Sequence, residues 1–260
     1  MISTHCPSMN WPEFYATRHQ RTQPLIVAHR GTPTIQPENT MPSFALALAQ
    51  GADVLETDLH FTRDHQIVLF HDATLDRMTD GQGALNQCSY RELQQRNTRA
   101  PGGQMTSARI PTLAQLIEAT AAQIPLLLEL KDPRFTDPRD AQRLVDLLDR
   151  YDMIQRTALV SFHPSYVATV EAVRAEIPTG NITMWNPLPT GKAELLGPVW
   201  PLLYANPWYV AWAHRLNKVV CPLDPKPEPR LPYYLKLGVD ALLTDDPATT
   251  LDAIKQASSQ

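Results

Sequence analysis

Short apolar runs alternate with longer amphipathic stretches along most of this 260-residue chain. A run of roughly four to eight apolar residues is typical of a strand that is buried on both faces in a parallel sheet. Such runs predict strands at residues 25–28, 54–58, 67–70 (a continuation or neighbour of the second strand), 126–130, 157–161, 179–184, 202–205, 218–221 and 241–244. The composition shows no break, so these roughly eight strand–helix steps predict an α/β fold with a single (β/α)8 barrel.

Capping signals mark where several of the intervening helices begin and end. Asn39 or Thr40 can cap a helix that has Pro42 in its first turn and Gly51 just past its end. The remaining predicted helices are residues 112–122 with a capping box at Thr112 and Gln115, a helix opened by Asp137-Pro138, residues 164–175, and a last helix capped by Asp246-Pro247.

Residues 72–111 depart from this alternation. They show little periodicity and contain residues that are typical of turns, namely Gly81, Gly83, Pro101, Gly102 and Gly103. We therefore expect a small loop-rich insertion after the second strand, above the barrel mouth. The predicted boundaries are an N-terminal extension over residues 1–24 and a barrel over 25–260, with the insertion at about 72–111.

The composition narrows the class of protein. With 43% hydrophobic residues, 19% charged residues and a net charge of −4, the chain is expected to form one globular domain and not to bind nucleic acid. Cys6, Cys88 and Cys221 form no disulfide or zinc pattern. We find neither a signal peptide nor an apolar run long enough to span a membrane. These features predict a cytoplasmic protein without stable membrane insertion, and they leave its oligomeric state open.

Three acidic residues stand at the carboxyl ends of predicted strands, where parallel α/β folds bind their ligands. Glu56 and Asp58 lie two positions apart, so their side chains point the same way. Glu129 interrupts an apolar strand, where an unpaired charge is costly. Three carboxylates without a cysteine favour Mg²⁺ or Ca²⁺, with Mn²⁺ as a further candidate, over zinc. The alternative is that each acid pairs with a lysine or arginine.

Two histidines, His29 and His71, directly follow apolar strands. Imidazole titrates near neutral pH, so the pair suits general acid and base roles in cleaving a phosphate ester. Arg30 and Lys131 are candidates to hold the phosphate, although they can equally neutralise the acids. His163 is predicted at the rim of the pocket, and surface or packing positions are predicted for His5, His19, His60, His65 and His214.

Taken together, the motifs resemble the glycerophosphodiester phosphodiesterase family, which has a TIM-barrel fold. The resemblance covers about residues 25–255. It rests on His29-Arg30-Gly31, Pro37-Glu38-Asn39-Thr40, Glu56-Thr57-Asp58, His71-Asp72 followed by Leu75, Arg77 and Thr79, Glu129-Leu130-Lys131, Ser161-Phe162, and Gly238-Val239-Asp240 leading to Thr244-Asp245.

The resemblance implies an activity and a role for each matching residue. The reaction is hydrolysis of a small-molecule glycerophosphodiester to glycerol 3-phosphate and an alcohol, with a divalent cation. The implied roles are metal ligands for Glu56, Asp58 and Glu129, an acid/base pair for His29 and His71, phosphate contacts for Arg30 and Lys131, and an orienting role for Glu38.

One segment departs from the family's pattern. Near the seventh strand the family often has a tryptophan and then an asparagine that line the pocket, whereas this chain has Val219-Val220-Cys221-Pro222-Leu223-Asp224. The aromatic wall is therefore missing, or it comes from Trp185, Trp208 or Trp212, for which packing in the core is the alternative. This departure concerns the headgroup of the substrate and not the chemistry.

Three rival functions remain open from the sequence. The first is a lysophospholipase D or sphingomyelinase D-like phosphodiesterase, which the lack of an obvious exposed amphipathic helix disfavours. The second is a barrel that binds ligand without catalysis, against which the retained histidines and carboxylates argue. The third is a sugar-phosphate isomerase, for which residues 243–247 make a poor phosphate loop.

Overall fold

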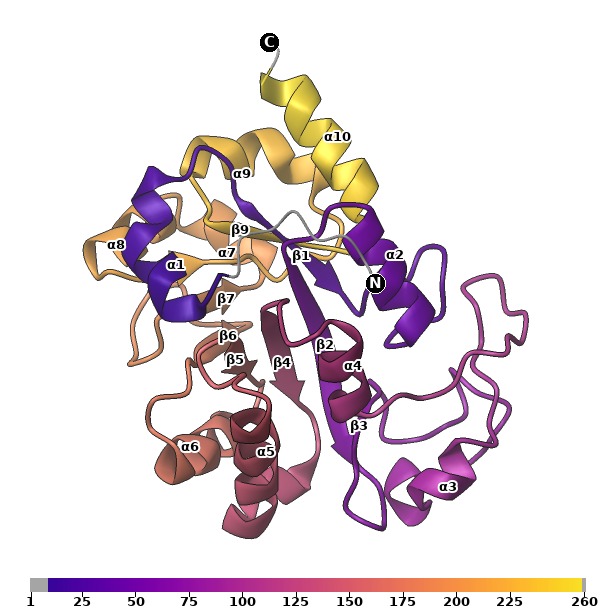
Figure 1. Cartoon of the computed structure of the whole chain (residues 1–260). Helices are drawn as coiled ribbons and strands as arrows, with labels where there is room; N and C mark the ends of the chain where they lie inside the picture. The colour runs from indigo at the N-terminus through magenta and orange to yellow at the C-terminus, as the bar shows by residue number, and fades with distance from the viewer. Residues whose placement is uncertain (1–8, 259–260) are drawn as a thin grey trace.

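The computed structural model describes residues 9–258, so the predictions for His5 and Cys6 lie outside the described part of the chain. Eight parallel strands follow one another around a barrel, and the helices lie mostly outside it (Figure 1). The strands are β1 (Leu25–His29), β2 (Val54–Phe61), β4 (Leu126–Leu130), β5 (Thr157–Val160), β6 (Gly180–Thr183), β7 (Leu195–Pro198), β8 (Val219–Val220) and β9 (Ala241–Thr244). A further strand, β3 (Ile67–Leu69), pairs antiparallel with β2.

Backbone hydrogen bonds join the two sheets that make up the barrel. One sheet has the strand order β5-β4-β2-β1-β9 and the other has the order β6-β7-β8. On one side Leu159 N donates to Pro178 O at 2.9 Å, just before β6, and on the other Asp240 N donates to Val220 O at 3.0 Å. These bonds close the eight strands into the predicted TIM barrel.

Helices connect most of the strands, and several begin at the predicted caps. Thr112 and Gln115 form the predicted capping box, and the Asp137 side chain accepts from Arg139 N. The α-helices are α1 (Trp11–Thr17), α2 (Met41–Ala49), α3 (Tyr90–Leu93), α4 (Leu113–Ala119), α5 (Pro138–Arg150), α6 (Pro164–Val173), α7 (Trp200–Ala205), α8 (Tyr209–Arg215), α9 (Leu231–Leu237) and α10 (Pro247–Ser258). The 3-10 helices are η1 (Arg18–Gln20), η2 (Leu85–Gln87), η3 (Pro133–Thr136) and η4 (Glu228–Arg230).

The predicted strand at residues 202–205 is wrong, because these residues belong to α7. Pro201 occupies the first turn of that helix, where proline is favoured. The strand of this repeat is β7, which the sequence hides because Gly197 and Pro198 interrupt its short apolar run. No helix lies between β6 and β7, whose connection over residues 184–194 is a loop.

The helix α1 closes the barrel at the amino-terminal ends of the strands. Trp11 and Phe14 are buried among the side chains that fill the barrel interior. The Trp11 indole Nε1 donates to Leu126 O at 3.1 Å, and Trp11 N donates to Gln155 O at 2.9 Å. The far end of the barrel is thus packed, which leaves the carboxyl ends of the strands as the open rim.

Residues 72–111 fold around a small core of their own beside β2 and β3. Val68 and Phe70 of the barrel side pack there against Leu75, Leu85, Leu93 and Ile110. This segment contains η2 and the one-turn helix α3 and is otherwise irregular (Figure 1). Within residues 9–258, no helix is long and apolar enough to cross a membrane.

Candidate active site

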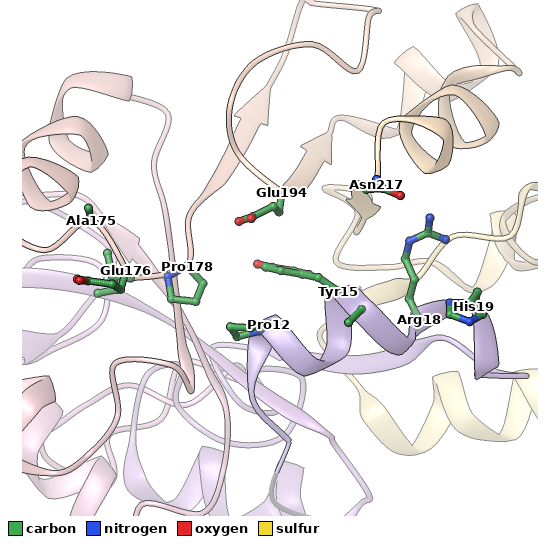
Figure 2. A pocket seen from close by; sticks show the side chains of 11 residues that line it. Pro12, Tyr15, Arg18, His19, Ala175, Glu176, Pro178, Glu194 and Asn217 are labelled. Atoms are coloured by element: carbon green, nitrogen blue, oxygen red, sulfur yellow. The ribbon is translucent and has the colours of Figure 1, made fainter.

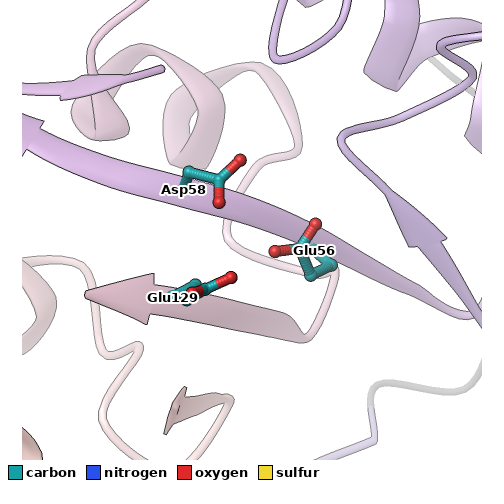
Figure 3. A group of neighbouring side chains, drawn as sticks. All are labelled: Glu56, Asp58 and Glu129. Carbon is teal, nitrogen blue, oxygen red and sulfur yellow. The ribbon is translucent and has the colours of Figure 1, made fainter. Parts of the chain in front are cut away.

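Three carboxylates meet between two neighbouring strands of the barrel (Figure 3). Glu56 and Asp58 are on β2, and the parallel register pairs Asp58 with Glu129 of β4. One oxygen of each of the three lies within 4.8 Å of those of the other two, and all three residues are buried. The structure thus brings together the three predicted metal ligands.

Two basic side chains lie among these three acids. Arg30 Nε lies 3.0 Å from Asp58 Oδ2, while Lys131 Nζ lies 2.7 Å from Glu129 Oε1 and 3.5 Å from Asp58 Oδ1. Glu56 forms no ion pair with a lysine or arginine within the described chain, and its Oε2 accepts from the backbone N of Arg30 at 3.0 Å. Among the described residues, Asp58 and Glu129 thus have basic partners, as the alternative to a metal site predicts, whereas Glu56 has none.

The unbalanced charge changes how the three carboxyls hold protons. Burial, together with the neighbouring Asp58, raises the pKa of Glu56 to about 8. Burial alone would raise the pKa of Asp58, but Arg30 and then Lys131 outweigh it and lower that pKa. Burial and then Asp58 raise the pKa of Glu129. The cluster consequently needs one more positive charge, from a proton or from a cation.

The oxygen atoms of the cluster fit a hard divalent cation. Asp58 Oδ1 and Glu129 Oε1 are buried, and they share one ammonium group, since Lys131 Nζ lies 3.5 Å from the first and 2.7 Å from the second. Buried carboxylates are costly unless they are paired or contact a metal ion, and the three acids have only Arg30 and Lys131 as basic partners among the described residues. Carboxylate oxygens are also the ligands that Mg²⁺ and Ca²⁺ prefer. Glu56, Asp58 and Glu129 could therefore hold such an ion.

Each of the two predicted catalytic histidines has a carboxylate on its Nδ1. His29 Nδ1 donates to Asp245 Oδ1 at 2.7 Å, and His71 Nδ1 donates to Asp72 Oδ1 at 2.6 Å. Because an ionised carboxylate only accepts, these bonds leave Nε2 of each ring available for proton exchange. His29 lies near Glu56, and His71 lies near Asp58, as their mutual electrostatic effects on pKa indicate.

The surroundings of the two rings shift their pKa values in opposite directions. Burial alone would lower the pKa of His29, but the hydrogen bond to Asp245 and the charge of Glu56 outweigh it and raise that pKa. Burial lowers the pKa of His71, and the positive charge of Arg30 contributes to the lowering. His29 is thus the ring that more readily keeps a second proton.

The turn after β1 holds its shape through three special backbone positions. Gly31 has a φ of 85°, and a Cβ there would lie 2.4 Å from the Ser43 Oγ, so only glycine fits. Arg30 and Asn39 also have positive φ values, 55° and 56°. Arg30 N donates to Glu56 O at 3.1 Å, so the strained turn fixes the arginine beside the acids.

Sequence reasoning missed the contact that Asn39 makes in the site. The cap position of α2 belongs to Thr40, while Asn39 Nδ2 donates to Asp58 Oδ2 at 2.9 Å and its Oδ1 accepts from Thr57 Oγ1 at 2.6 Å. Both of these partners come from β2, so the side chain ties the β1–α2 loop to that strand. The one sequence signal for this contact was the position of Asn39 within the Pro-Glu-Asn-Thr motif.

A row of alternating charges extends from the second histidine to the acids. Arg77 Nε donates to Asp72 Oδ2 at 2.6 Å, and Arg77 Nη2 donates to Glu38 Oε1 at 2.6 Å. Glu38 in turn accepts from Arg30 Nη1 at 3.2 Å. Although burial would raise it, the pKa of Asp72 falls to about 2 because Arg77 and His71 hydrogen-bond to it. Glu38 thus contacts the first motif through Arg30, and its orienting role stays a prediction.

His60 is buried and contacts the second histidine motif. Its Nε2 donates to the His71 carbonyl oxygen at 3.1 Å, and its Nδ1 lies 3.6 Å from Asp132 Oδ2. These contacts agree with the predicted packing role and place the ring behind His71. His163, predicted at the rim, occupies the N-cap position of α6 after β5 and is exposed.

A small apolar cavity of about 50 Å³ continues from the acids into the barrel. His29, Glu56 and Glu129 line it together with the apolar side chains of Leu127, Val160, Ile182, Leu195, Cys221, Leu223 and Leu243. Burial raises the pKa of the Cys221 thiol to about 12, so the thiol is neutral. The alternative that Trp185, Trp208 and Trp212 pack in the core is wrong, because all three are exposed, and none of them lines this cavity.

A larger cavity, of about 630 Å³, lies at the opposite end of the barrel (Figure 2). It opens between α1 and the segments that lead into β6, β7 and β8, and Tyr15 points its hydroxyl toward Glu194 there. Chemistry in barrels of this class takes place at the carboxyl ends of the strands. None of the predicted catalytic or metal-binding residues lines this cavity, so it is not the candidate active site.

Comparison with known proteins adds independent evidence. Residues 29–249 match the model of the Glycerophosphoryl diester phosphodiesterase family. The chain is similar to a glycerophosphodiester phosphodiesterase of Caldanaerobacter subterraneus, at 26% identity over 89% of this chain and 98% of the relative. Another from Bacillus altitudinis is 28% identical over 85% and 94%. A solved Oleispira antarctica phosphodiesterase in complex with the product sn-glycerol-3-phosphate superimposes with a TM-score of 0.79, at 25% identity over 89% of this chain and 97% of that one.

Proposed function

The chain belongs to the glycerophosphoryl diester phosphodiesterase family, and from this premise we propose that it hydrolyses a glycerophosphodiester to glycerol 3-phosphate and an alcohol. The observation that carries the proposal is the meeting of three buried carboxylates and two carboxylate-bound histidines at one rim of the barrel. The structural relative that contains sn-glycerol-3-phosphate supports the same product for this chain.

We assign the divalent cation to Glu56, Asp58 and Glu129. When bound, it supplies positive charge to a phosphate oxygen and lowers the pKa of a neighbouring hydroxyl. Lys131 Nζ lies between Glu129 and Asp58 and can shift toward the substrate phosphate once the acids have another partner. Arg30 stays attached to Asp58 and Glu38 and presents a fixed guanidinium to the same phosphate. Both neutralise charge that builds on the phosphoryl oxygens.

The two histidines exchange protons with the substrate through their Nε2 atoms. The lowered pKa of His71 suits the base that takes the proton of the attacking hydroxyl, and the raised pKa of His29 suits the acid that protonates the departing alcohol. Attack by the neighbouring glycerol hydroxyl forms a P–O bond and a cyclic phosphate while the P–O bond to the alcohol breaks. Water then opens the ring, with the two histidines in reversed roles.

The decisive experiment is a product assay on the purified protein and three histidine variants. Phosphorus NMR would follow glycerophosphocholine, glycerophosphoethanolamine and lysophosphatidylcholine with Mg²⁺, Ca²⁺ or Mn²⁺ and with chelator. We expect metal-dependent release of glycerol 3-phosphate, and a loss of roughly 10²–10⁴-fold in kcat for His29→Ala and for His71→Ala. His19→Ala is the matched control, because His19 is exposed at the far end of the barrel.

Two results would contradict the proposal in different ways. Full turnover by both histidine variants at saturating cation would remove the acid–base assignment and leave the substrate class intact. Turnover of lysophosphatidylcholine alone, with release of choline or a cyclic product, would instead move the substrate class to the lysophospholipase D alternative. No turnover of any diester with any cation would support a barrel that only binds ligand.

A further inference from the structure

The helix α8 is apolar on its outer as well as its inner face. Tyr209, Val210 and Ala213 point inward and are buried. On the outer side, Trp208 just before the helix, Trp212, and Leu216 just after it follow at helical spacing, with exposed fractions of 76%, 41% and 45%. A surface helix normally presents polar residues to water. The described residues therefore leave an apolar stripe uncovered on the outer side of α8.

The loop between β6 and β7 extends the apolar surface toward the barrel mouth. Because this connection has no helix, residues 184–194 run across the outside of the barrel as a loop. Trp185 lies two residues past the end of β6 and is 87% exposed, and Leu188 is also exposed. Asn206 fixes the loop to the start of α8, since its Nδ2 donates to Pro187 O at 2.8 Å and its Oδ1 accepts from Trp208 N at 3.1 Å.

We refer to Trp185, Leu188, Trp208, Trp212 and Leu216 as the aromatic face. Its charge differs from that of the rest of the chain. Within residues 177–223 Glu194 is the one acidic residue, although the whole chain has 27. Arg215 stands on the outer side of α8, seven positions after Trp208, and Lys192 is exposed on the loop. Neither has an ion-pair partner in the described part of the chain.

We propose that the aromatic face is a docking surface for anionic phospholipid membranes. Tryptophan side chains favour the boundary between lipid headgroups and acyl chains, where their rings leave water and their N–H groups still find partners. Uncompensated arginine and lysine beside such residues add attraction to anionic lipids, and the scarcity of carboxylates removes the opposing repulsion. The contact lies on the membrane surface and does not span it, which agrees with the absence of a membrane-spanning helix among residues 9–258.

The position of the aromatic face relates docking to the access of substrates to the candidate active site. Trp185 lies just past the carboxyl end of β6, and the three acids lie toward the same rim of the barrel. Docking would hold one side of that rim near lipid, where phosphodiesters released from phospholipids first appear. The docking itself requires no turnover, so it stands or falls independently of the proposed function.

Flotation with lipid vesicles tests the proposal directly. The probe is an equimolar phosphatidylglycerol and phosphatidylcholine vesicle, compared with a vesicle of phosphatidylcholine alone. We expect the protein to float with the anionic vesicle, with a blue shift in tryptophan emission, and to be released as salt rises from about 0.05 to about 0.5 M. The Trp208→Ala/Trp212→Ala double variant should lower the partition coefficient by at least about tenfold. Arg215→Glu should lower it by about fivefold or more.

Two controls separate docking from general effects of substitution. Arg91→Glu makes the same charge change on an exposed residue of the distant insertion, and Met105→Ala removes an exposed apolar side chain there. Both should bind vesicles like the parent protein. All four variants should hydrolyse a soluble diester at the parent rate, so a catalytic defect and a docking defect are scored in the same samples.

Several outcomes would overturn the proposal. One is a parent protein that does not float with the anionic vesicle. Another is binding that the tryptophan and arginine variants leave unchanged, because a different surface would then be responsible. A third is a parent protein that is a dimer by light scattering and becomes a monomer in the double variant, because a second copy of the chain would then cover the face.

Discussion

The two sides of the barrel contribute different chemistry to the mouth. β1, β2 and β4, with the residues that follow them, supply the acids, the cations and the first histidine. β6, β7 and β8, with the residues that follow them, supply no charged group to the cavity and line it with apolar atoms of Ile182, Leu195 and Cys221. The β1–β4 side is also held by hydrogen bonds from loop to strand, such as that from Asn39 to Asp58.

The residues proposed to break the bond therefore come from one side of the barrel, and the residues that shape the substrate pocket come from the other. Parallel register places His29 beside Glu56 and Asp58 beside Glu129, so the relative positions of the reactive groups follow from three adjacent strands. The opposite wall is formed by strands of only two to four residues and by a loop without a helix. Changes on the β1–β4 side should therefore alter turnover, and changes on the β6–β8 side should alter substrate preference.

The largest effect is expected from removing one carboxylate of the cluster. Glu129→Gln keeps the shape but removes a charge, and a bound cation supplies several kcal/mol of transition-state stabilisation, so kcat/KM should fall by roughly 10³-fold. Steady-state kinetics across a cation titration would measure this. Glu13→Gln, on the exposed side of α1, is the control. A variant that regains full activity at high cation concentration would show that Glu129 affects affinity alone.

A smaller loss is expected from Asp245→Asn. The substitution keeps a hydrogen-bonding group near His29 Nδ1 but removes the charge that helps to keep the ring protonated. We expect kcat to fall by about 10–100-fold, part of the full contribution of a general acid or base, with KM little changed. The alkaline limb of the pH–rate profile, which reports loss of the proton from His29, should also move to lower pH, because the pKa of the ring falls without the Asp245 charge. An unchanged profile with lower kcat would indicate a structural defect instead.

Cation affinity should depend on pH because Glu56 holds a proton in the metal-free protein. Its raised pKa of about 8 means that the carboxyl is protonated below that pH, and a cation must displace the proton. Affinity should therefore rise by about tenfold per pH unit up to about pH 8 and then level off. Calorimetry in buffers of different ionisation enthalpy would count the proton released. Release of no proton at pH 7 would contradict the assignment.

The smallest change in turnover is expected on the β6–β8 side. Ile182→Ala should widen the apolar wall and change the ratio of kcat/KM between two diesters by about tenfold or less, with kcat on the better substrate nearly unchanged. Competition between glycerophosphocholine and glycerophosphoethanolamine gives this ratio directly. A loss of kcat as large as that of the histidine variants would remove the distinction between the two sides of the barrel.

The sequence was most informative where chemistry forced unusual residues into apolar strands. Glu129 inside a leucine run and the alternation of Glu56 with Asp58 were sufficient to predict the cluster, because period-two geometry fixes the direction of side chains. Predicting the cluster required no knowledge of the loops. The roles of its three residues as metal ligands remain predictions, as do the roles of the histidines and the boundaries of the extension and the insertion.

The sequence was least informative where contacts depend on residues far apart in the chain. Asp245 reaches His29 across 216 positions, because β9 pairs with β1 when the barrel closes. No local pattern could reveal this contact. Similarly, β7 lacked a continuous apolar run, and α8 has apolar residues on both sides, so its sequence pattern does not separate the exposed residues from the buried ones. Exposure is a property of the assembled molecule, and so the tryptophans were placed correctly only by the structure.

The position of α1 defines how this chain can be dissected in the laboratory. Its Trp11 and Phe14 occupy the bottom layer of the barrel interior, although they precede the first barrel strand and the segment that matches the family. A fragment starting at residue 25 would leave the carbonyl oxygen of Leu126 without its indole donor and open the interior to water. The smallest piece that folds unaided should therefore begin no later than the Asn10 cap of α1.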